Sequence, residues 1–182
     1  GLPGRWARFS FLAARPVLVF TARGFRCEIS AQGRTQTLYG SPWLWLEELC
    51  GRFELPPDPA IEFPMGGAFG YWGYDLKHFL EPRLPRLAIN DLEAPDAWIG
   101  FYPSLLAFDH PSRRCWAIAT GFDADGARSL ALLREQLDFW TRRYDDVRGQ
   151  SADAVQPVPP PAFPARNARV ASLEQGSAGP PP

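Results

Sequence analysis

The stretch GGAFGYWGYD, residues 66–75, is the most distinctive part of the chain, because glycines and large aromatic residues alternate through it before an acid ends it. A phosphate-binding loop of the Walker type would need Gly-Lys-Ser or Gly-Lys-Thr, and neither occurs here. A dinucleotide fingerprint would need glycines spaced GxGxxG between a strand and a helix, whereas Gly67, Gly70 and Gly73 recur at every third residue. The spacing therefore favours a packing role over phosphate binding.

The packing interpretation treats the run as a place where another part of the backbone approaches closely, which glycine permits because it has no Cβ. If the run is helical, its glycines form a smooth stripe with aromatic side chains around it. The four glycines of the run destabilise an isolated helix by roughly 3–4 kcal/mol relative to alanine, so tertiary contacts must compensate. Asp75 is either a partner for a nearby arginine or backbone amide, which we expect, or a catalytic acid. The structural motif comprises Gly66, Gly67, Gly70, Tyr71, Gly73, Tyr74 and Asp75.

Upstream of the run, residues 9–40 have the composition of an antiparallel strand meander. Val, Phe, Ile and Thr are frequent in this segment, and the Arg-Gly and Gln-Gly pairs at 23–24 and 32–33 are turn signals. Pro16 is expected at a strand start or a bulge, because proline cannot donate a hydrogen bond to a strand ladder.

Two helices are predicted on either side of the run. Ser41 followed by Pro42 is a typical helix start and predicts a helix over residues 42–52. Residues 123–147 form the clearest amphipathic pattern in the chain, with charged residues on the face opposite the apolar one. The expected buried positions are Leu44, Leu46, Leu49 and Cys50 in the first helix and Leu130, Leu133, Leu137 and Trp140 in the second.

Between these helices, residues 98–110 (WIGFYPSLLAFDH) are apolar and aromatic enough for one core strand. Pro111-Ser112 predicts a turn, after which residues 113–121 return as the second strand of a hairpin. The elements together predict an α+β fold of antiparallel β-sheets with a few flanking helices. We expect this domain to span residues 1–148.

The last part of the chain has a different composition. From residue 149 onward proline, alanine, serine and glycine predominate, as in PVPPPAFPARN and GSAGPPP. Such a segment cannot bury enough apolar surface to offset its conformational entropy. We therefore expect residues 149–182 to be a linker or a disordered tail.

Bulk composition narrows the function classes. The net charge of −1 provides no field that would attract nucleic acid or an anionic membrane, and no apolar run approaches the roughly 20 residues of a membrane helix. The three cysteines are widely spaced and contain no CxxC pair, so we expect buried free thiols in a cytoplasmic protein. His78 and His110 lack the spacing of metal ligands, and no GxSxG elbow is present. The sequence thus gives no catalytic residue and no metal ligand.

Trp6-Ala7-Arg8-Phe9 is the strongest candidate for a binding group. It places an arginine between aromatic residues where the chain enters its first strand. Such a group could line a small amphipathic pocket in which Arg8 pairs with a carboxylate. The competing interpretation is an exposed arginine between core aromatics.

The glycine run also resembles a family motif. FPMGGAFGYWGYDLKHFLEPRLP, residues 63–85, is similar to PFxGGxxGYxxYDxxRxxExLP in the amino-terminal domain of chorismate-utilising synthases, namely component I of aminodeoxychorismate synthase and of anthranilate synthase. RFSFLAARPVLVFTARG at 8–24, SPWLWLEELCGRF at 41–53 and PDAWIGFYPSLLAFDHPSRRCWAIAT at 95–120 resemble further family segments in the same order. The resemblance covers roughly residues 5–147. FDH and RRCW in the last segment lean towards the aminodeoxychorismate branch.

The resemblance implies a non-catalytic role for this chain. In the family, chorismate, magnesium and the chemistry belong to a larger carboxy-terminal half, which has no counterpart in residues 1–182. We therefore expect no cofactor in this chain, magnesium only in the full-length enzyme, and no activity for the fragment alone. The implied partners are the chorismate-binding catalytic domain, a glutaminase subunit and tryptophan.

The resemblance also gives Trp6, Ala7, Arg8 and Phe9 a specific role. In the family an early Tyr/Arg-Ser-Arg/Tyr-Phe segment partly lines a tryptophan pocket, and these four residues match it by position. Ala7 replaces the serine of the segment and cannot donate a side-chain hydrogen bond. In the family an LLES-like stretch precedes the segment, and its counterpart would be expected before Gly1.

Three functions therefore remain open from the sequence. The first is the amino-terminal domain of aminodeoxychorismate synthase component I, whose full enzyme aminates chorismate at C4 with glutamine-derived ammonia for folate synthesis. The second is the tryptophan-sensing domain of anthranilate synthase component I. The third is a free-standing, non-catalytic binding domain.

Overall fold

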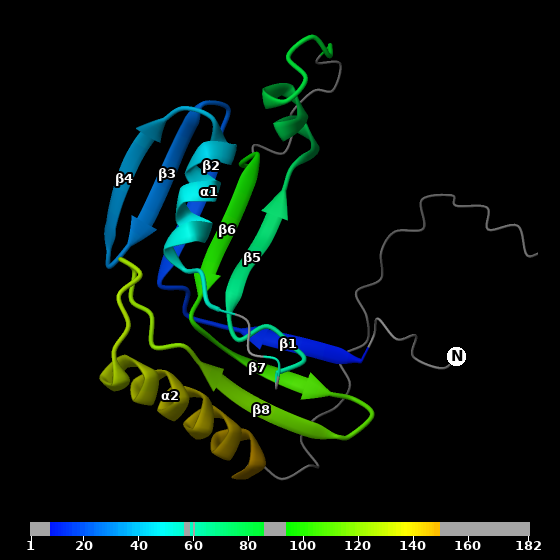
Figure 1. The fold of residues 1–182 in the computed structure, drawn as a ribbon, viewed down its shortest axis with the longest axis vertical. Helices are drawn as coiled ribbons and strands as arrows, with labels where there is room; N and C mark the ends of the chain where they lie inside the picture. The colour runs from blue at the N-terminus through cyan, green and yellow to red at the C-terminus, as the bar shows by residue number, and fades with distance from the viewer. Residues whose placement is uncertain (1–7, 57–58, 60, 86–93, 150–182) are drawn as a thin grey trace, which may run out of the picture. The chain divides into compact units, whose positions relative to one another are not determined.

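The computed structural model describes residues 8–56, 59, 61–85 and 94–149, which form two antiparallel β-sheets and three helices (Figure 1). The α+β class expected from the sequence is confirmed. The strands are β1 Phe9–Ala13, β2 Leu18–Arg23, β3 Arg26–Ala31, β4 Arg34–Tyr39, β5 Gly67–Trp72, β6 Ala97–Tyr102, β7 Ser104–Asp109 and β8 Arg114–Ala119. The helices are α1 Pro42–Arg52, the 3-10 helix η1 Tyr74–Phe79 and α2 Leu130–Gly149.

The larger sheet has the strand order β4-β3-β2-β6-β5. Its β2-β3-β4 part is the meander predicted for residues 9–40, and it turns at Gly24 and at Gln32-Gly33, which have positive φ. The prediction was wrong for β1, which pairs with β7 in the smaller sheet, ordered β1-β7-β8. Arg15 adopts a left-handed φ of 58° and Pro16 follows it, so the chain changes direction between β1 and β2.

Helix α1 covers one face of the larger sheet (Figure 1). It begins at Pro42 after the N-cap residue Ser41, as predicted, although the Ser41 side chain makes no capping hydrogen bond. Leu46 and Leu49 pack into the core with side chains of β2, β3 and β6, of which the largest fully buried are Leu18, Phe20, Cys27 and Ile99.

Two of the buried positions expected in α1 were wrong: Leu44 is 66% exposed and Cys50 is also exposed. The buried face repeats at Pro42, Leu46 and Leu49, steps of four and three residues. Leu44 lies two residues from Leu46, which places it on the far side of the helix.

The single strand predicted for residues 98–110 was also wrong, because Pro103 divides it into β6 and β7 in different sheets. Pro103 has no N–H to continue a ladder, and its carbonyl accepts hydrogen bonds from the backbone N and the Oγ1 of Thr120 at 2.8 Å each. The β7–β8 hairpin is confirmed, with Ser104 opposite Ala119 and Asp109 opposite Arg114.

Helix α2 lies along the smaller sheet and begins at Leu130, seven residues later than predicted (Figure 1). The acidic start of the predicted helix is a turn, in which Asp123 Oδ1 accepts hydrogen bonds from the backbone N–H groups of Asp125 and Ala127. Ser129 Oγ then accepts from Leu132 N at 3.2 Å and caps the helix. Trp140 is buried as predicted, whereas Leu130 is exposed.

The glycine run is not helical. Residues 67–72 form strand β5 and residues 74–79 form η1. The close backbone approach predicted for the glycines is present nonetheless, against β6 and the residue before it. A Cβ at Gly70 would overlap the Trp98 carbonyl oxygen, and a Cβ at Gly66 or Gly73 would lie 2.8 Å from a backbone oxygen of Tyr102 or Asp96. The close contacts along this strand edge are thus made by Gly66, Gly70 and Gly73, whereas a Cβ at Gly67 would meet only the Phe69 side chain.

The cysteines are free, but only Cys27 is buried, and burial raises the pKa of its thiol to about 11. The expectation of three buried thiols was therefore wrong for Cys50 and Cys115, which are exposed. Within the described ranges, no helix is long and apolar enough to cross a membrane. The proposed tail at 149–182 lies outside the described residues except for Gly149, so the boundary at residue 148 stays a prediction.

Candidate functional site

The structure describes only half of the candidate binding group Trp6-Ala7-Arg8-Phe9. Trp6 and Ala7 lie outside the described residues, while Arg8 and Phe9 lie at the start of β1. Antiparallel pairing places Phe9 opposite Asp109, and His110 N donates to the Arg8 carbonyl oxygen at 3.0 Å. The register of the smaller sheet therefore sets the position of Arg8 beside the end of β7.

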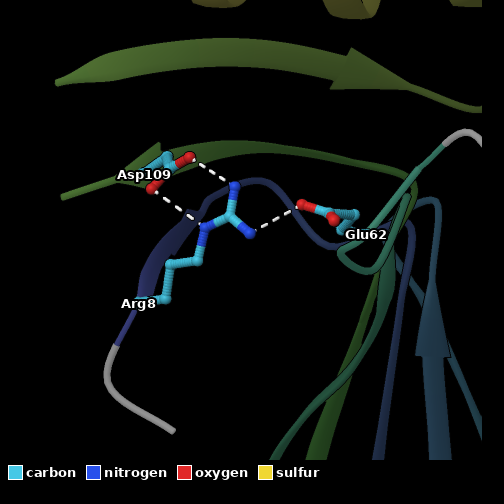
Figure 2. A network of polar contacts seen from close by, with 3 residues as sticks. All are labelled: Arg8, Glu62 and Asp109. Carbon is cyan, nitrogen blue, oxygen red and sulfur yellow. Dashed lines mark hydrogen bonds and ion pairs between the residues drawn. The ribbon is translucent and has the colours of Figure 1, made fainter. Parts of the chain in front are cut away.

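The Arg8 guanidinium contacts two carboxylates of its own chain, as Figure 2 shows. Its Nε and Nη2 donate to Oδ1 and Oδ2 of Asp109 at 3.2 and 2.8 Å, which is a bidentate pair. Its Nη1 lies 2.7 Å from Oε2 of Glu62, which belongs to the segment before the glycine run. One arginine thus joins β1, β7 and that connecting segment.

The two carboxylates differ in exposure and therefore in how easily each could leave Arg8. The Asp109 side chain is 2% exposed, whereas that of Glu62 is 65% exposed. The hydrogen bond from Arg8 lowers the pKa of the Asp109 carboxyl, with a further contribution from Ser112, and the same pair raises the pKa of Arg8. Asp109 is thus the buried partner of Arg8, and Glu62 is the exposed one.

Aromatic side chains surround this ion pair. The Arg8 guanidinium carbon lies 4.6 Å from the centroid of the Phe9 ring. The Phe9 ring meets Phe63 edge-on at 5.4 Å, and Phe63 lies 5.4 Å from Trp116 of β8. The arrangement combines a cation with apolar walls, which is the character expected for an amphipathic pocket.

Two cavities adjoin this cluster. A cavity of about 430 Å³ is lined by Arg8, Phe9, Asp109 and Trp116 among others. A second cavity of about 350 Å³ lies beside Pro103, where the chain passes from β6 to β7. It is lined mainly by apolar side chains, including Phe53, Phe101 and Phe122. Ile61 and Phe63 line both cavities, so residues 61–63 form the wall between them.

Several participants were not singled out from the sequence. Glu62 is far from Arg8 along the chain and carries no local signal, whereas Phe63 and Trp116 belong to the FPMGG and RRCW parts of the resemblance, which do not connect them to Arg8. Asp109 had a signal, because it belongs to the FDH segment of the resemblance. Ser10 and His110 were also missed as a pair, although Ser10 Oγ lies 2.7 Å from His110 Nε2 and ties β1 to the end of β7.

The acid that ends the glycine run is placed differently from the expectation. Asp75 Oδ1 lies 3.7 Å from Nε2 of His78 in η1, so its neighbour is a histidine and not an arginine. His78 is buried, and its Nε2 has no hydrogen-bond partner within the described residues. Tyr71 donates through its hydroxyl to the Pro95 carbonyl at 3.0 Å, and Lys77 lies over the Tyr74 ring at 3.8 Å.

The part of the chain that the structure describes contains no set of side chains suited to bind magnesium. No group of three or more His, Cys, Asp and Glu side chains there could hold a metal ion.

No protein-family model matches the chain. The chain is 34% identical over 113 residues to anthranilate synthase component 1 of Synechocystis, covering 62% of this chain and 22% of that protein. It is 31% identical over 106 residues to aminodeoxychorismate synthase component 1 of Escherichia coli, covering 58% and 23%. A third relative, anthranilate synthase component 1 of Acetivibrio thermocellus, is 30% identical over 151 residues, covering 82% and 30%.

Solved structures agree on the fold. The crystal structure of anthranilate synthase component I from Streptococcus pneumoniae superposes with a TM-score of 0.60 and 24% identity, over 84% of this chain and 32% of that one. The chain therefore spans less than a third of the length of each of these relatives.

Proposed function

We propose that the chain belongs to the component I family of anthranilate and aminodeoxychorismate synthases and is the amino-terminal, non-catalytic domain of an aminodeoxychorismate synthase component I. The observation that supports the domain assignment is the contrast in coverage. Most of this chain aligns with component I proteins of both kinds, yet it accounts for less than a third of each.

The proposed enzyme replaces the C4 hydroxyl of chorismate with an amino group, using ammonia that a glutaminase partner releases from glutamine. In this proposal the chorismate-binding portion of component I carries out the chemistry. The present chain packs against that portion and helps to hold the glutaminase. The β7–β8 hairpin supports the aminodeoxychorismate branch, because it carries the FDHPSRRCW segment at residues 108–116.

Arg8 has a structural part in this proposal. Through Asp109 and Glu62 it fixes the start of β1 against the smaller sheet and against the segment that leads to β5. It would thereby keep the two cavities and the wall between them at residues 61–63 in place for the assembled enzyme.

The second candidate is the tryptophan-responsive domain of an anthranilate synthase component I. The anthranilate synthase relatives align with the chain at identities similar to that of the aminodeoxychorismate synthase relative. The apolar cavities beside Arg8 also support it, because an amino acid with an aromatic side chain requires apolar walls and a cation for its carboxylate.

One assay separates these candidates. The chain is co-purified with the remaining component I portion and the glutaminase from the same source and supplied with chorismate and glutamine. We expect aminodeoxychorismate, identified by conversion to para-aminobenzoate on adding a lyase, and no fluorescent anthranilate. Anthranilate formation that tryptophan suppresses would favour the second candidate. If the chain does not associate with the other proteins, a free-standing binding domain becomes the better description.

A further inference from the structure

We propose that the surface formed by β5 and η1 is where the remaining component I polypeptide docks, with an extended segment of that polypeptide pairing along the free edge of β5. The inference rests on the proposed function and goes further by naming the surface. We call this surface the docking edge and define it as residues 67–84.

The free edge of β5 lacks the features that protect natural sheet edges. β5 ends the five-stranded sheet, and no strand among the described residues pairs with its outer side. Its sequence, GAFGYW, has no charged residue and no proline. Such an edge is a template for another strand, because its N–H and C=O groups have no sheet partner. The opposite edge strand, β4, carries Arg34 and is largely polar (RTQTLY).

Both faces of β5 are also only partly covered by the described residues. Gly70 and Trp72 pair with Ile99 and Ala97, which are buried beneath α1, so they lie on the same face of the sheet. α1 does not extend over β5, as Figure 1 shows, and Trp72 remains 49% exposed. On the other face Tyr71 is also exposed. None of the six residues of β5 is fully buried.

Exposed apolar side chains are concentrated here. The described residues include thirteen large hydrophobic side chains that are exposed, and five of them fall between residues 71 and 84. Isolated exposed apolar residues are ordinary, but a local concentration marks an interaction surface. The five are Tyr71, Trp72, Tyr74, Leu80 and Leu84.

The relatives indicate the occupant. In the Streptococcus pneumoniae structure the shared fold makes up 32% of the chain, so twice as much polypeptide lies outside it. An incoming strand would satisfy the backbone groups of β5, and side chains beside it would cover the aromatic residues on both faces. A polypeptide of the same protein fits this edge better than a charged ligand, because residues 67–72 contain no charge.

Hydrogen exchange tests the location directly. The chain alone is compared with the complex obtained by co-expressing it with the remaining component I portion from the same source. We expect the backbone amides of Gly67–Trp72 to exchange at least about tenfold more slowly in the complex, as new strand hydrogen bonds require. The amides of Arg34–Tyr39 in β4 should exchange at the same rate in both samples.

Matched charge substitutions test the energetics. Ala68 on β5 and Thr37 on β4 are both exposed and lie at opposite edges of one sheet. Ala68→Lys should weaken association by roughly tenfold or more, because it places a charge beside the incoming strand, and Thr37→Lys should leave it unchanged. Thermal melts of each variant check folding, and Trp72→Ser provides a second test of the same surface should Ala68→Lys fail to fold.

The outcomes separate the two levels of the proposal. A complex in which β5 stays unprotected, or which Ala68→Lys and Trp72→Ser leave intact, overturns the docking edge and leaves the proposed function standing. Protection of β5 that grows with the concentration of the chain alone overturns it in favour of a second copy. Failure of the native chain to form any complex overturns both.

Discussion

Strands β2 and β5 belong to the same sheet with only β6 between them, yet they differ in how completely the chain covers them. In β2, Leu18, Phe20 and Ala22 are almost wholly buried beneath α1. β5 carries three aromatic residues, and its tyrosine and tryptophan remain exposed. Apolar content alone therefore does not decide burial. Burial depends on the position of a strand relative to the covering helix, and the exposed aromatic surface of β5 is available to a partner.

The largest expected effect comes from truncating one side chain in each strand. Phe20 is fully buried, so Phe20→Ala should lower the free energy of unfolding by about 3–5 kcal/mol through lost burial and the cavity left behind. Trp72→Ala should change it by about 1 kcal/mol or less in the isolated chain, because half of that side chain already contacts solvent. Urea denaturation followed by fluorescence measures both.

Equal losses from Phe20→Ala and Trp72→Ala would break the comparison. They would mean that Trp72 is covered in solution by part of the same chain. In the complex proposed above, the cost of Trp72→Ala should rise, because the partner then buries the ring.

The glycines of β5 provide the next test, since they make the contact between β5 and β6 possible. A Cβ at Gly70 would overlap the backbone of Trp98 and Ile99, which cannot move without separating the two strands. Gly70→Ala should therefore destabilise the chain by about 1–3 kcal/mol. Gly51 in α1 is the matched control, because a Cβ there meets nothing within 4 Å.

The control should change stability in the opposite direction. Gly51→Ala removes backbone freedom from the unfolded chain inside a helix, so it should stabilise by about 0.5–1 kcal/mol. If Gly70→Ala proved as harmless as Gly51→Ala in thermal melts, the close approach of β5 to β6 would not describe the protein in solution.

Local sequence signals predicted the elements whose cause is local. The turn glycines at 24 and 33, the Ser41-Pro42 helix start and the β7–β8 hairpin follow from the conformational preferences of the residues themselves. The α+β class follows from these elements. The helix proposed for the glycine run failed because closely spaced glycines fit a helical stripe and also fit contacts along a strand that lies close to its neighbour.

Local sequence signals did not predict where the chain passes from one sheet to the other. Pro103 interrupts a run of apolar residues that looks continuous, and only the pairing partners show that the two halves enter different sheets. Likewise Arg8 was singled out from its aromatic neighbours, but its partner Asp109 is 101 residues away. A pairing of that separation depends on strand register, which no pattern of neighbouring residues specifies.

The smallest expected effect concerns the Arg8–Asp109 pair. Both side chains of this pair have partners within the chain, whereas the outer edge of β5 has no strand partner among the described residues. Arg8 keeps its charge at every pH at which the fold is studied, so the titrating member is Asp109, whose folded-state pKa lies below its ordinary value of 3.8. The ionised pair therefore stabilises the fold fully above that ordinary value. The contribution is lost as pH falls from about 4 through the lowered pKa.

Asp109→Asn keeps the size of the side chain and removes the charge. We expect it to lower the melting temperature near pH 7, and the difference from the native chain should shrink steadily once the pH falls below about 4. Glu62→Gln is the matched control, because it removes the exposed carboxylate from the same guanidinium and should cost little at any pH. A difference for Asp109→Asn that stayed constant down to pH 2 would show that the bidentate pair contributes shape and not charge.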